Sequence, residues 1–488
     1  MKNLNRKLIN SLATGLLVMA GLALSGPAAS AADTWTGAAS ANWADSNWTG
    51  GNNPPVGGDV LIFTSATGAG GTALNDNLAS FNVAGITFNS GAAAFTVGGN
   101  AFNLTGGVTN SSTSLETIND PFSLAAVGIF KTTTGGGNLV LGGNLSGAGS
   151  LTVAGTGVVT LSGANSYAGA TTNNGGTLLL NSGTALPPTT TLVVNSGGIV
   201  DLNGQSNNIL NFAAGNAAGM ITNSASGTGT LTLTNWTTTL NALVADGATG
   251  PVALDDIGQY QPTGGSLGNN NNTFSGGLTL GQVISGGSAY NRFAFPGALA
   301  PNGVPGNITN SYFGRGTITI GRSATDRAQI YLGGGAGETL LNNLIVNTAA
   351  GGDRVGTFRV DATTLVLKGT VTANLAPLAF SCNSASACAV IVAGQITGPN
   401  GLWLRFNPSV AGDVVTCTLS NVTANANNYQ GGTEIDASGS AVFTLAMGAT
   451  NQFPTAPMPA MSPTTGRSSS TVTARRSTGF GDQARWTG

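Results

Sequence analysis

The side chains that could carry out catalysis are few in this chain of 488 residues. The chain contains no histidine, which excludes Ser-His-Asp and Cys-His nucleophilic arrangements and histidine-based metal sites. Carboxylate, lysine, arginine and tyrosine chemistry remains. Asp255 and Asp256 are the only adjacent acidic pair, but neighbours on a strand point to opposite faces, so a shared site would need a loop. We interpret Asp255 to Gly258 as a polar turn after a short apolar run.

The richest polar region runs from Arg315 to Asp361. It contains Arg315, Arg322, Arg327, Arg354, Arg359, Asp326, Asp353 and Asp361. Parallel β-helix polysaccharide lyases use Arg or Lys as a base beside Asp-bound Ca²⁺, so this region is a candidate site. However, Asp326-Arg327 and Asp353-Arg354 resemble local charge pairs at turns, and no spacing matches a calcium-binding loop. We therefore favour a solvated, partly paired face with no metal and no cofactor. The residues to examine first for carbohydrate contact are Arg315, Arg322, Arg327, Tyr331 and Tyr312.

The three cysteines lie late in the chain, at Cys382, Cys388 and Cys417. In an oxidising compartment Cys382 and Cys388 could close a short hairpin loop. The sequence equally allows Cys417 to pair with either of the other two, and buried free thiols are a further alternative. The spacing matches no zinc pattern, so we expect no metal here.

The elements that must position these residues are visible between Leu145 and Leu180. Apolar residues there alternate with Thr, Ser and Gly in three short runs, 151–153, 159–161 and 178–180, with Gly, Asn and Ala between them. Alternation with period 2, bounded by turn-forming residues, is typical of half-buried β-strands. No run reaches helical length, so the segment predicts strands.

Weaker copies of this segment recur along the chain. The stretch 165–171 has partial echoes at 272–279 and 428–433, and the stretch 145–151 has one at 396–402. The echoes are unevenly spaced. They predict an all-β chain folded as a right-handed parallel β-helix, or β-solenoid, with degenerate repeats.

The best-kept copy resembles the autotransporter-associated β-strand repeat of bacterial secreted passenger proteins. The resemblance covers about one coil in full and about two more in part. The matching residues are Gly147, Gly149, Leu151, Val159, Leu161, Ser162, Gly163, Asn165, Tyr167, Gly169, Thr171, Gly176, Thr177 and Leu178. The resemblance implies a solenoid in an export context, and implies little about biochemical activity.

Composition agrees with a stacked β-coil. Only 7% of residues are charged, whereas ordinary domains carry roughly a quarter, and 76 residues are Gly. Disorder and membrane helices are both disfavoured, because the 41% apolar residues are spread in short alternating runs. A net charge of −2 gives no indication of nucleic-acid binding, which relies on many Lys and Arg contacts to phosphates.

Residues 1–31 have the features of a signal peptide. Lys2, Arg6 and Lys7 form a basic region, 12–24 is apolar, and 29–31 fits the small-x-small rule for cleavage before Ala32. An uncleaved membrane anchor is the alternative. We expect a secreted or cell-surface protein with no transmembrane helix in the mature chain.

The remaining chain divides into segments that differ in how regularly apolar residues alternate with polar ones. We expect an N-terminal cap and first strands at 32–130, the clearest coils at 131–250, a looser loop or insertion at 251–305, further coils at 306–453, and a disordered or aberrant tail at 454–488. Trp35, Trp43 and Trp48 are interpreted as covering the open end of the solenoid. An exposed aromatic row that stacks on sugar rings is the alternative.

Two functions follow. The favoured one is a non-catalytic secreted or cell-surface β-solenoid, a passenger-like adhesin or a structural protein of the extracellular matrix, with polysaccharide or cell-surface and matrix components as partners. The alternative is a β-helix polysaccharide lyase or glycosidase that uses the face between Arg315 and Asp361.

Overall fold

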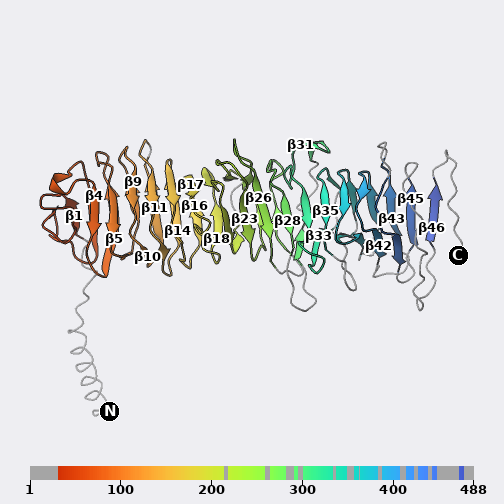
Figure 1. Cartoon of the computed structure of the whole chain (residues 1–488), viewed down its shortest axis with the longest axis horizontal. Coiled ribbons are helices and arrows are strands. Elements are labelled where there is room, and N and C mark those ends of the chain that lie inside the picture. Colours follow the sequence, from red (N-terminus) through yellow and green to blue (C-terminus); the bar gives the residue numbers. More distant parts are fainter. Residues whose placement is uncertain are drawn as a thin grey trace, which may run out of the picture.

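Short strands form wherever apolar and small polar residues alternate, because each strand then buries one face. In a computed structural model the chain is described over residues 31–476, with gaps at 134, 214–217, 259–263, 282–290, 295–300, 334–336, 349–356, 362, 383–386, 407–413, 422–426, 438–441 and 448–471. The described residues form strands that stack into a long rod, with N- and C-terminal strands at opposite ends (Figure 1). Alternating burial is plain in β3 (Asp59–Phe63) and β23 (Gly229–Leu233).

Five sheets run along the rod, and successive strands of the chain mostly belong to different sheets. Sheet 1 has the order β13 (Leu145–Ser146), β10 (Phe122–Leu124), β7 (Phe102–Leu104), β5 (Phe81–Phe88), β8 (Val108–Asn110), β11 (Gly128–Thr132), β14 (Leu151–Gly155), β16 (Thr171–Asn173), β18 (Thr191–Val194) and β21 (Asn211–Phe212), with β1 (Ala32–Trp35), β2 (Trp48–Thr49) and β3 joined to it. Sheet 2 has the order β25 (Leu243–Val244), β22 (Met220–Thr222), β19 (Gly198–Asp201), β17 (Gly176–Leu180), β15 (Val158–Leu161), β12 (Leu139–Leu141), β9 (Glu116–Ile118), β6 (Thr96–Gly99) and β4 (Ala73–Asp76).

The sheets of the second half follow the same principle. Sheet 3 has the order β20 (Ser206–Ile209), β23, β26 (Val252–Asp256), β28 (Leu278–Leu280), β32 (Ile318–Ile320), β35 (Leu344–Val346), β38 (Val371–Ala373) and β41 (Ile396–Thr397). Sheet 4 has the order β29 (Asn291–Ala294), β33 (Ala328–Gly333), β36 (Phe358–Asp361), β39 (Leu378–Ser381), β42 (Leu402–Phe406) and β44 (Thr433–Ala437). Sheet 5 has the order β34 (Glu338–Leu340), β37 (Thr364–Leu367), β40 (Cys388–Val392), β43 (Val414–Leu419), β45 (Val442–Met447) and β46 (Val472–Arg476).

Three small elements complete the description. They are the pair β24 (Thr239–Leu240) and β27 (Ser266–Leu267), the antiparallel hairpin β30 (Asn302–Val304) and β31 (Asn307–Asn310), and the 3₁₀ turn η1 (Gly68–Gly70). Strands of successive turns pair in parallel, so each turn of the chain forms one rung of a solenoid. The prediction of an all-β parallel β-solenoid is confirmed. No helix of the described part is long and apolar enough to cross a membrane.

The core is a set of apolar columns that run through successive rungs. One column of sheet 2 joins six buried residues in register: Leu139, Val159, Leu178, Val200, Ile221 and Val244. An aromatic column of sheet 1 stacks Phe102 on Phe122, with ring centroids 5.0 Å apart. Alignment of like residues between rungs lets each rung bury its apolar side chains against the next.

The three tryptophans near the N-terminal end belong to this core. Trp35, Trp43 and Trp48 are at most 2% exposed, and Trp48 contacts both of the others edge-on at centroid distances of 5.0 and 5.9 Å. Phe63 of the next rung packs against all three. Their burial makes the alternative of an exposed aromatic row wrong, since no ring face is open to a sugar.

The interpretation of Asp255 and Asp256 as a turn is also wrong. Both lie in β26 and pair in register with Thr232 and Leu233 on one side and with Thr279 and Leu280 on the other. Asp256 points inward and is buried, while Asp255 faces outward. The strand forms because both neighbouring rungs supply its hydrogen bonds, which the polar sequence of this stretch does not reveal.

Candidate functional site

The residues proposed for carbohydrate contact are divided between two sheets. Arg315 precedes β32 of sheet 3, Arg322 and Arg327 follow that strand, and Tyr331 lies in β33 of sheet 4. Tyr312 is buried at 7% exposure, and Asp353 and Arg354 lie outside the described residues. The structure therefore gives these residues separate surroundings rather than one face.

Arg315 is held by a network that reaches across two rungs. Its guanidinium pairs with Asp246, with Nη2 and Oδ2 3.1 Å apart, and its Nε donates to the carbonyl oxygen of Thr273 at 2.6 Å. The other carboxylate oxygen of Asp246 accepts from the backbone N–H groups of Val252 and Ser275, both at 2.9 Å. With 41% of its side chain exposed, Arg315 keeps further N–H groups available to a ligand.

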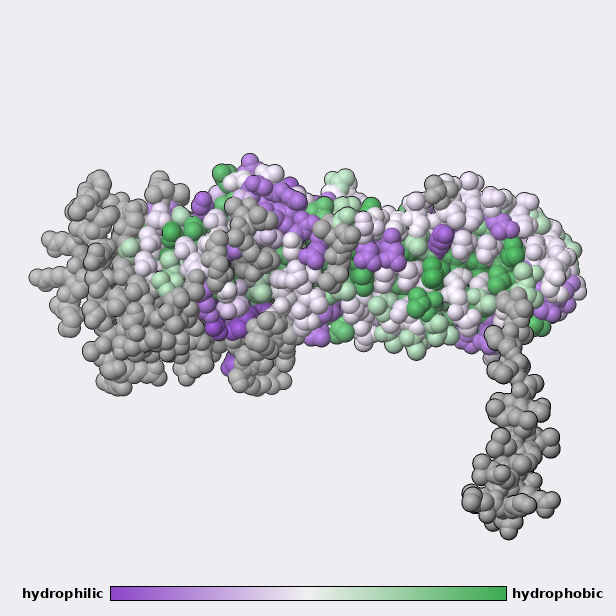
Figure 2. Space-filling model, turned by 180° about the vertical axis from the view of Figure 1, so that it is seen from behind, coloured by the Kyte–Doolittle hydropathy of each residue, from purple (hydrophilic) through white to green (hydrophobic). Residues whose placement is uncertain are grey.

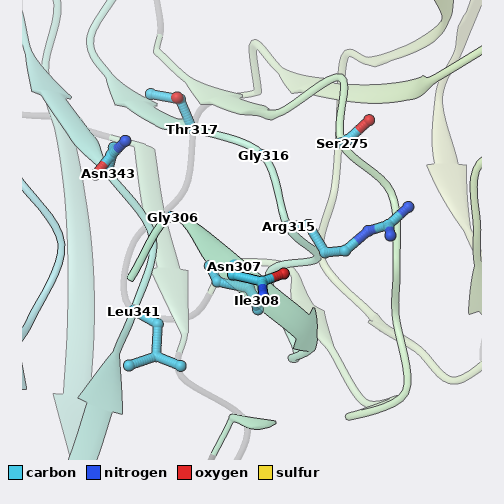
Figure 3. A pocket seen from close by; sticks show the side chains of 9 residues that line it. All are labelled: Ser275, Gly306, Asn307, Ile308, Arg315, Gly316, Thr317, Leu341 and Asn343. Atoms are coloured by element: carbon cyan, nitrogen blue, oxygen red, sulfur yellow. The ribbon is translucent and has the colours of Figure 1, made fainter. Parts of the chain in front are cut away.

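Arg315 lines a pocket of about 450 Å³ beneath the β30–β31 hairpin, which projects from the rod in Figure 1. The lining residues are Ser275, Gly306, Asn307, Ile308, Arg315, Gly316, Thr317, Leu341 and Asn343. Figure 3 shows Asn307 and Ile308 of the hairpin near Arg315, with Thr317 and Asn343 on the neighbouring segments. Asn343 Oδ1 accepts from the Thr370 backbone N–H at 3.0 Å, which fixes the orientation of its amide.

The pocket lining is mostly polar, and Arg315 is the only ionisable residue among its described members. Amides, hydroxyls and one guanidinium can donate to and accept from the hydroxyl groups of a sugar, or donate to a single anionic substituent. None of the described residues that line the pocket carries a carboxylate, and Arg315 of the lining is paired with that of Asp246. The groups present can bind a polar ligand.

Arg322 and Asp326 make structural contacts with other parts of the solenoid, rather than the carbohydrate contact and the local Asp326-Arg327 pair considered from the sequence. The Arg322 guanidinium pairs with Asp255 of β26, two rungs earlier in sheet 3. Burial lowers the pKa of Arg322, an effect that the nearby Asp326 opposes. Asp326 is buried and accepts from the Arg322 backbone N–H at 2.6 Å and from Ser323 Oγ at 2.7 Å, so it stabilises the turn between β32 and β33.

Tyr331 lies between two arginines. The Arg292 guanidinium, from the preceding strand of sheet 4, lies 4.9 Å from the ring centroid, and that of Arg359, from the following strand, lies 5.1 Å away. Arg359 is itself paired with Asp361 at 2.5 Å. These contacts stabilise the cations over the ring and occupy the surface that a sugar would stack on.

The cysteines are structural. Cys382 and Cys388 form a disulfide between the end of β39 and the start of β40. Cys417 is a buried free thiol in β43, and burial raises its pKa to about 12. Such a thiol is unreactive at neutral pH.

The repeat-motif residues hold the rungs together. Asn165 Oδ1 accepts from the Leu145 N–H at 2.8 Å, and its Nδ2 donates to the Ala185 carbonyl oxygen at 2.7 Å. Asn427, and not Asn428, takes the equivalent place near the C-terminal end, where it accepts from the Ile396 N–H at 2.8 Å. The echo at 428–433 therefore begins one residue earlier, at Asn427, than the sequence comparison placed it.

Asp246 is the site residue that sequence reasoning missed. It lies 69 residues before its partner Arg315, in a stretch without a motif. Only the register of the rungs brings the two together, so no local signal in the sequence marks Asp246.

Comparison of the chain with protein-family models, curated proteins and solved structures found no match.

Proposed function

We propose that the chain is an exported, non-catalytic β-solenoid of the cell surface or extracellular matrix, a passenger-like adhesin or structural protein that binds polysaccharide. The pocket beside Arg315 would be one of its docking sites. The observation that carries the proposal is the composition of that pocket, which combines hydroxyls and amides with a single arginine already fixed by Asp246. The resemblance of 145–180 to autotransporter-associated repeats and the signal-peptide features of 1–31 support the export context.

The ion pairs favour binding over the lyase alternative. A lyase base must lose its proton near neutral pH, and an arginine paired with a carboxylate stays protonated. Arg315, Arg322 and Arg359 are paired with Asp246, Asp255 and Asp361.

An outward column of sheet 3 offers a second, repetitive contact surface. Its members are in register over eight rungs: Asn208, Thr232, Asp255, Thr279, Thr319, Ile345, Thr372 and Thr397. Five of the eight are threonines, so the column presents hydroxyl groups on rungs about 4.8 Å apart, interrupted by Asp255 and Ile345. Figure 2 shows a surface mostly of intermediate hydropathy, with polar and apolar residues in small groups. Many weak contacts of this kind become useful through multivalency.

The test is retention of the purified chain on immobilised polysaccharides, neutral and acidic, with assay of the supernatant for released sugar ends. We expect retention without release, and a loss of at least about tenfold in affinity for Arg315→Ala, because charge-assisted hydrogen bonds contribute about 1.5–3 kcal/mol. Lys131→Ala is the matched control, since it removes an exposed cation far from the pocket. Absence of retention on every polysaccharide would contradict binding, and release of sugar ends that Arg322→Ala abolishes would establish the lyase instead.

The export part of the proposal has its own test. N-terminal sequencing of exported material should give a mature chain that begins at Ala32.

A further inference from the structure

The N-terminal part of the solenoid carries negative charge without a positive counterpart. Between Ala32 and Phe130 the chain has six carboxylates and neither lysine nor arginine. Asp45 is the one that is not buried; the five buried carboxylates are Asp33, Asp59, Asp76, Glu116 and Asp120. A buried carboxylate needs hydrogen bonds, a cation or a proton, because burial otherwise strongly disfavours its ionised form.

Two of the five, Glu116 and Asp59, receive most of this compensation from the protein. Glu116 accepts from the Phe95 N–H and from Ser112 Oγ, both at 2.8 Å. Asp59 accepts from the Val56 N–H at 2.8 Å and from Asn52 Nδ2 at 2.9 Å. Asp33 accepts from the Asn52 N–H at 2.5 Å, and its second carboxylate oxygen has no partner within the described residues.

Asp76 receives no more compensation than Asp33, and Asp120 receives less. Asp76 accepts one hydrogen bond, from the Leu78 N–H at 2.9 Å, and its second carboxylate oxygen has no partner. Neither carboxylate oxygen of Asp120 has a partner within the described residues. Asp76 and Asp120 are both 0% exposed. Together with the second oxygen of Asp33, four buried carboxylate oxygens of this segment thus lack a donor within the described residues.

The two aspartates belong to one column of sheet 2. Asp76 of β4 is in register with Gly99 of β6, and continuation of the β6–β9 pairing places Asp120 opposite Gly99 in the next rung. Gly99 has no side chain to separate them, and a Cβ there would lie 2.1 Å from the Asp76 carbonyl oxygen. The two carboxylates therefore belong to the rungs on either side of Gly99, and both are buried.

We propose that Asp76 and Asp120 together bind one divalent cation of the oxygen-preferring class, with Ca²⁺ as its representative. Carboxylate oxygens are the ligands this class prefers, and the segment 32–130 offers neither imidazole nor thiolate for softer metals. Backbone carbonyl oxygens and water would complete the coordination. Because both side chains are enclosed, the cation enters as these rungs fold and stabilises the cap and the first sheets. The proposal is independent of the polysaccharide pocket, which lies in the other half of the chain.

The test uses the full chain, unfolded in denaturant with a chelator and refolded at about pH 8, above the pKa of both carboxylates, with or without CaCl₂. Refolding in CaCl₂ is expected to raise the thermal unfolding midpoint in a saturable way, with one ion per chain retained after gel filtration and measured by elemental analysis. Asp120→Asn is expected to weaken binding by at least about tenfold. The variant keeps the size of the side chain and removes an unpaired buried charge, so in chelator it should unfold at a higher temperature than the wild type.

Glu116→Gln is the matched control. It neutralises a buried carboxylate of the same segment whose oxygens already have donors, so the response to Ca²⁺ should remain. The proposal fails if the wild type does not respond to Ca²⁺ while Asp120→Asn still gains stability, which would mean that a proton alone neutralises the pair. It also fails if Asp76→Asn and Asp120→Asn both keep the full response, which would place the cation elsewhere.

Discussion

Single asparagine side chains connect three rungs of this solenoid. Asn165 bonds to the backbone of one rung before it and one after it, and Asn272 does the same, accepting from the Val244 N–H and donating to the Tyr312 carbonyl oxygen, both at 2.9 Å. Each amide satisfies backbone groups that burial would otherwise leave unpaired. These residues are structural, although their repetition in the sequence also suits a binding motif.

Replacement of Asn165 by alanine should lower the free energy of unfolding by roughly 2–4 kcal/mol, because one buried N–H and one buried C=O lose their partners. Urea unfolding followed by circular dichroism measures the change. The control is Asn174→Ala, which removes an exposed amide bonded only to Asn195 at 2.7 Å and should cost less than about 1 kcal/mol. Equal losses of unfolding free energy in the two variants would contradict a stabilising role for the buried Asn165 amide.

The motif positions of tyrosine and threonine vary together within the chain. Tyr167 and Thr171 share a hydrogen bond of 2.5 Å between their hydroxyls, and Tyr429 and Thr433 share one of 2.7 Å. In the intervening copy the same two places hold Phe274 and buried Leu278. A buried hydroxyl needs its partner, so both residues change or neither does.

A double-mutant cycle tests this coupling. Thr171→Val alone should destabilise by roughly 1–3 kcal/mol, since the Tyr167 hydroxyl is left unpaired while Thr190 keeps its bond to the Gly169 carbonyl oxygen. The added change Tyr167→Phe should recover part of that loss. Strict additivity of the two single changes would contradict the pairing.

Strands were the element most readily predicted from sequence. The runs 151–153, 159–161 and 178–180 correspond to β14, β15 and β17, since alternation and glycine-rich turns mark them locally. By contrast β26 and β28 fall within 251–305, where loop texture was expected. β26 and β28 are stabilised by pairing with strands of the neighbouring turns, and this pairing is not visible in the local sequence. The site was less predictable for the same reason: Arg315 was identified, but Asp246 and the β30–β31 hairpin were not.

The N-terminal aromatic cluster is the element-scale feature with the clearest energetic role. Trp48→Ala should cost about 3–5 kcal/mol, because it removes a buried ring that contacts Trp35, Trp43 and Phe63. Hydrogen exchange should quicken in β1, β3 and β5 and stay unchanged in sheet 3, since each rung contacts only its neighbours. Leu115→Ala, at a site 52% exposed, is the control and should change stability by less than about 0.5 kcal/mol. Loss of protection along the whole rod would contradict a local cap.

Across the whole molecule, buried carboxylates set the response to pH. Burial raises the pKa of Asp76 to about 6 and that of Glu338 to about 7, and burial with the charge of Asp76 raises that of Asp120 to about 7. The folded chain therefore binds more protons than the unfolded chain, whose carboxyl pKa values lie near 4. Stability is full below about pH 4 with respect to these groups and is lost as the pH rises to about 7.

In chelator, the unfolding midpoint should consequently be higher at about pH 5 than at about pH 8. Scanning calorimetry across this range measures the trend. Asp120→Asn combined with Glu338→Gln should flatten it, because two of the groups that release protons are then absent. A midpoint that rises with pH in the wild type would contradict the assignment of raised pKa values.

The hydrogen bonds between rungs run along the axis of the rod, so the solenoid has low resistance to a force that pulls its two ends apart. Pulling on its two ends loads these bonds rung by rung, so the chain should unwind in sequence rather than all at once. Bonds between equivalent places in neighbouring rungs join residues 20 to 40 apart in the chain. Each released rung would then lengthen the molecule by about 70–135 Å at about 3.4 Å per residue. A force–extension trace with steps of that size would describe a tether that yields gradually while its remaining rungs stay folded.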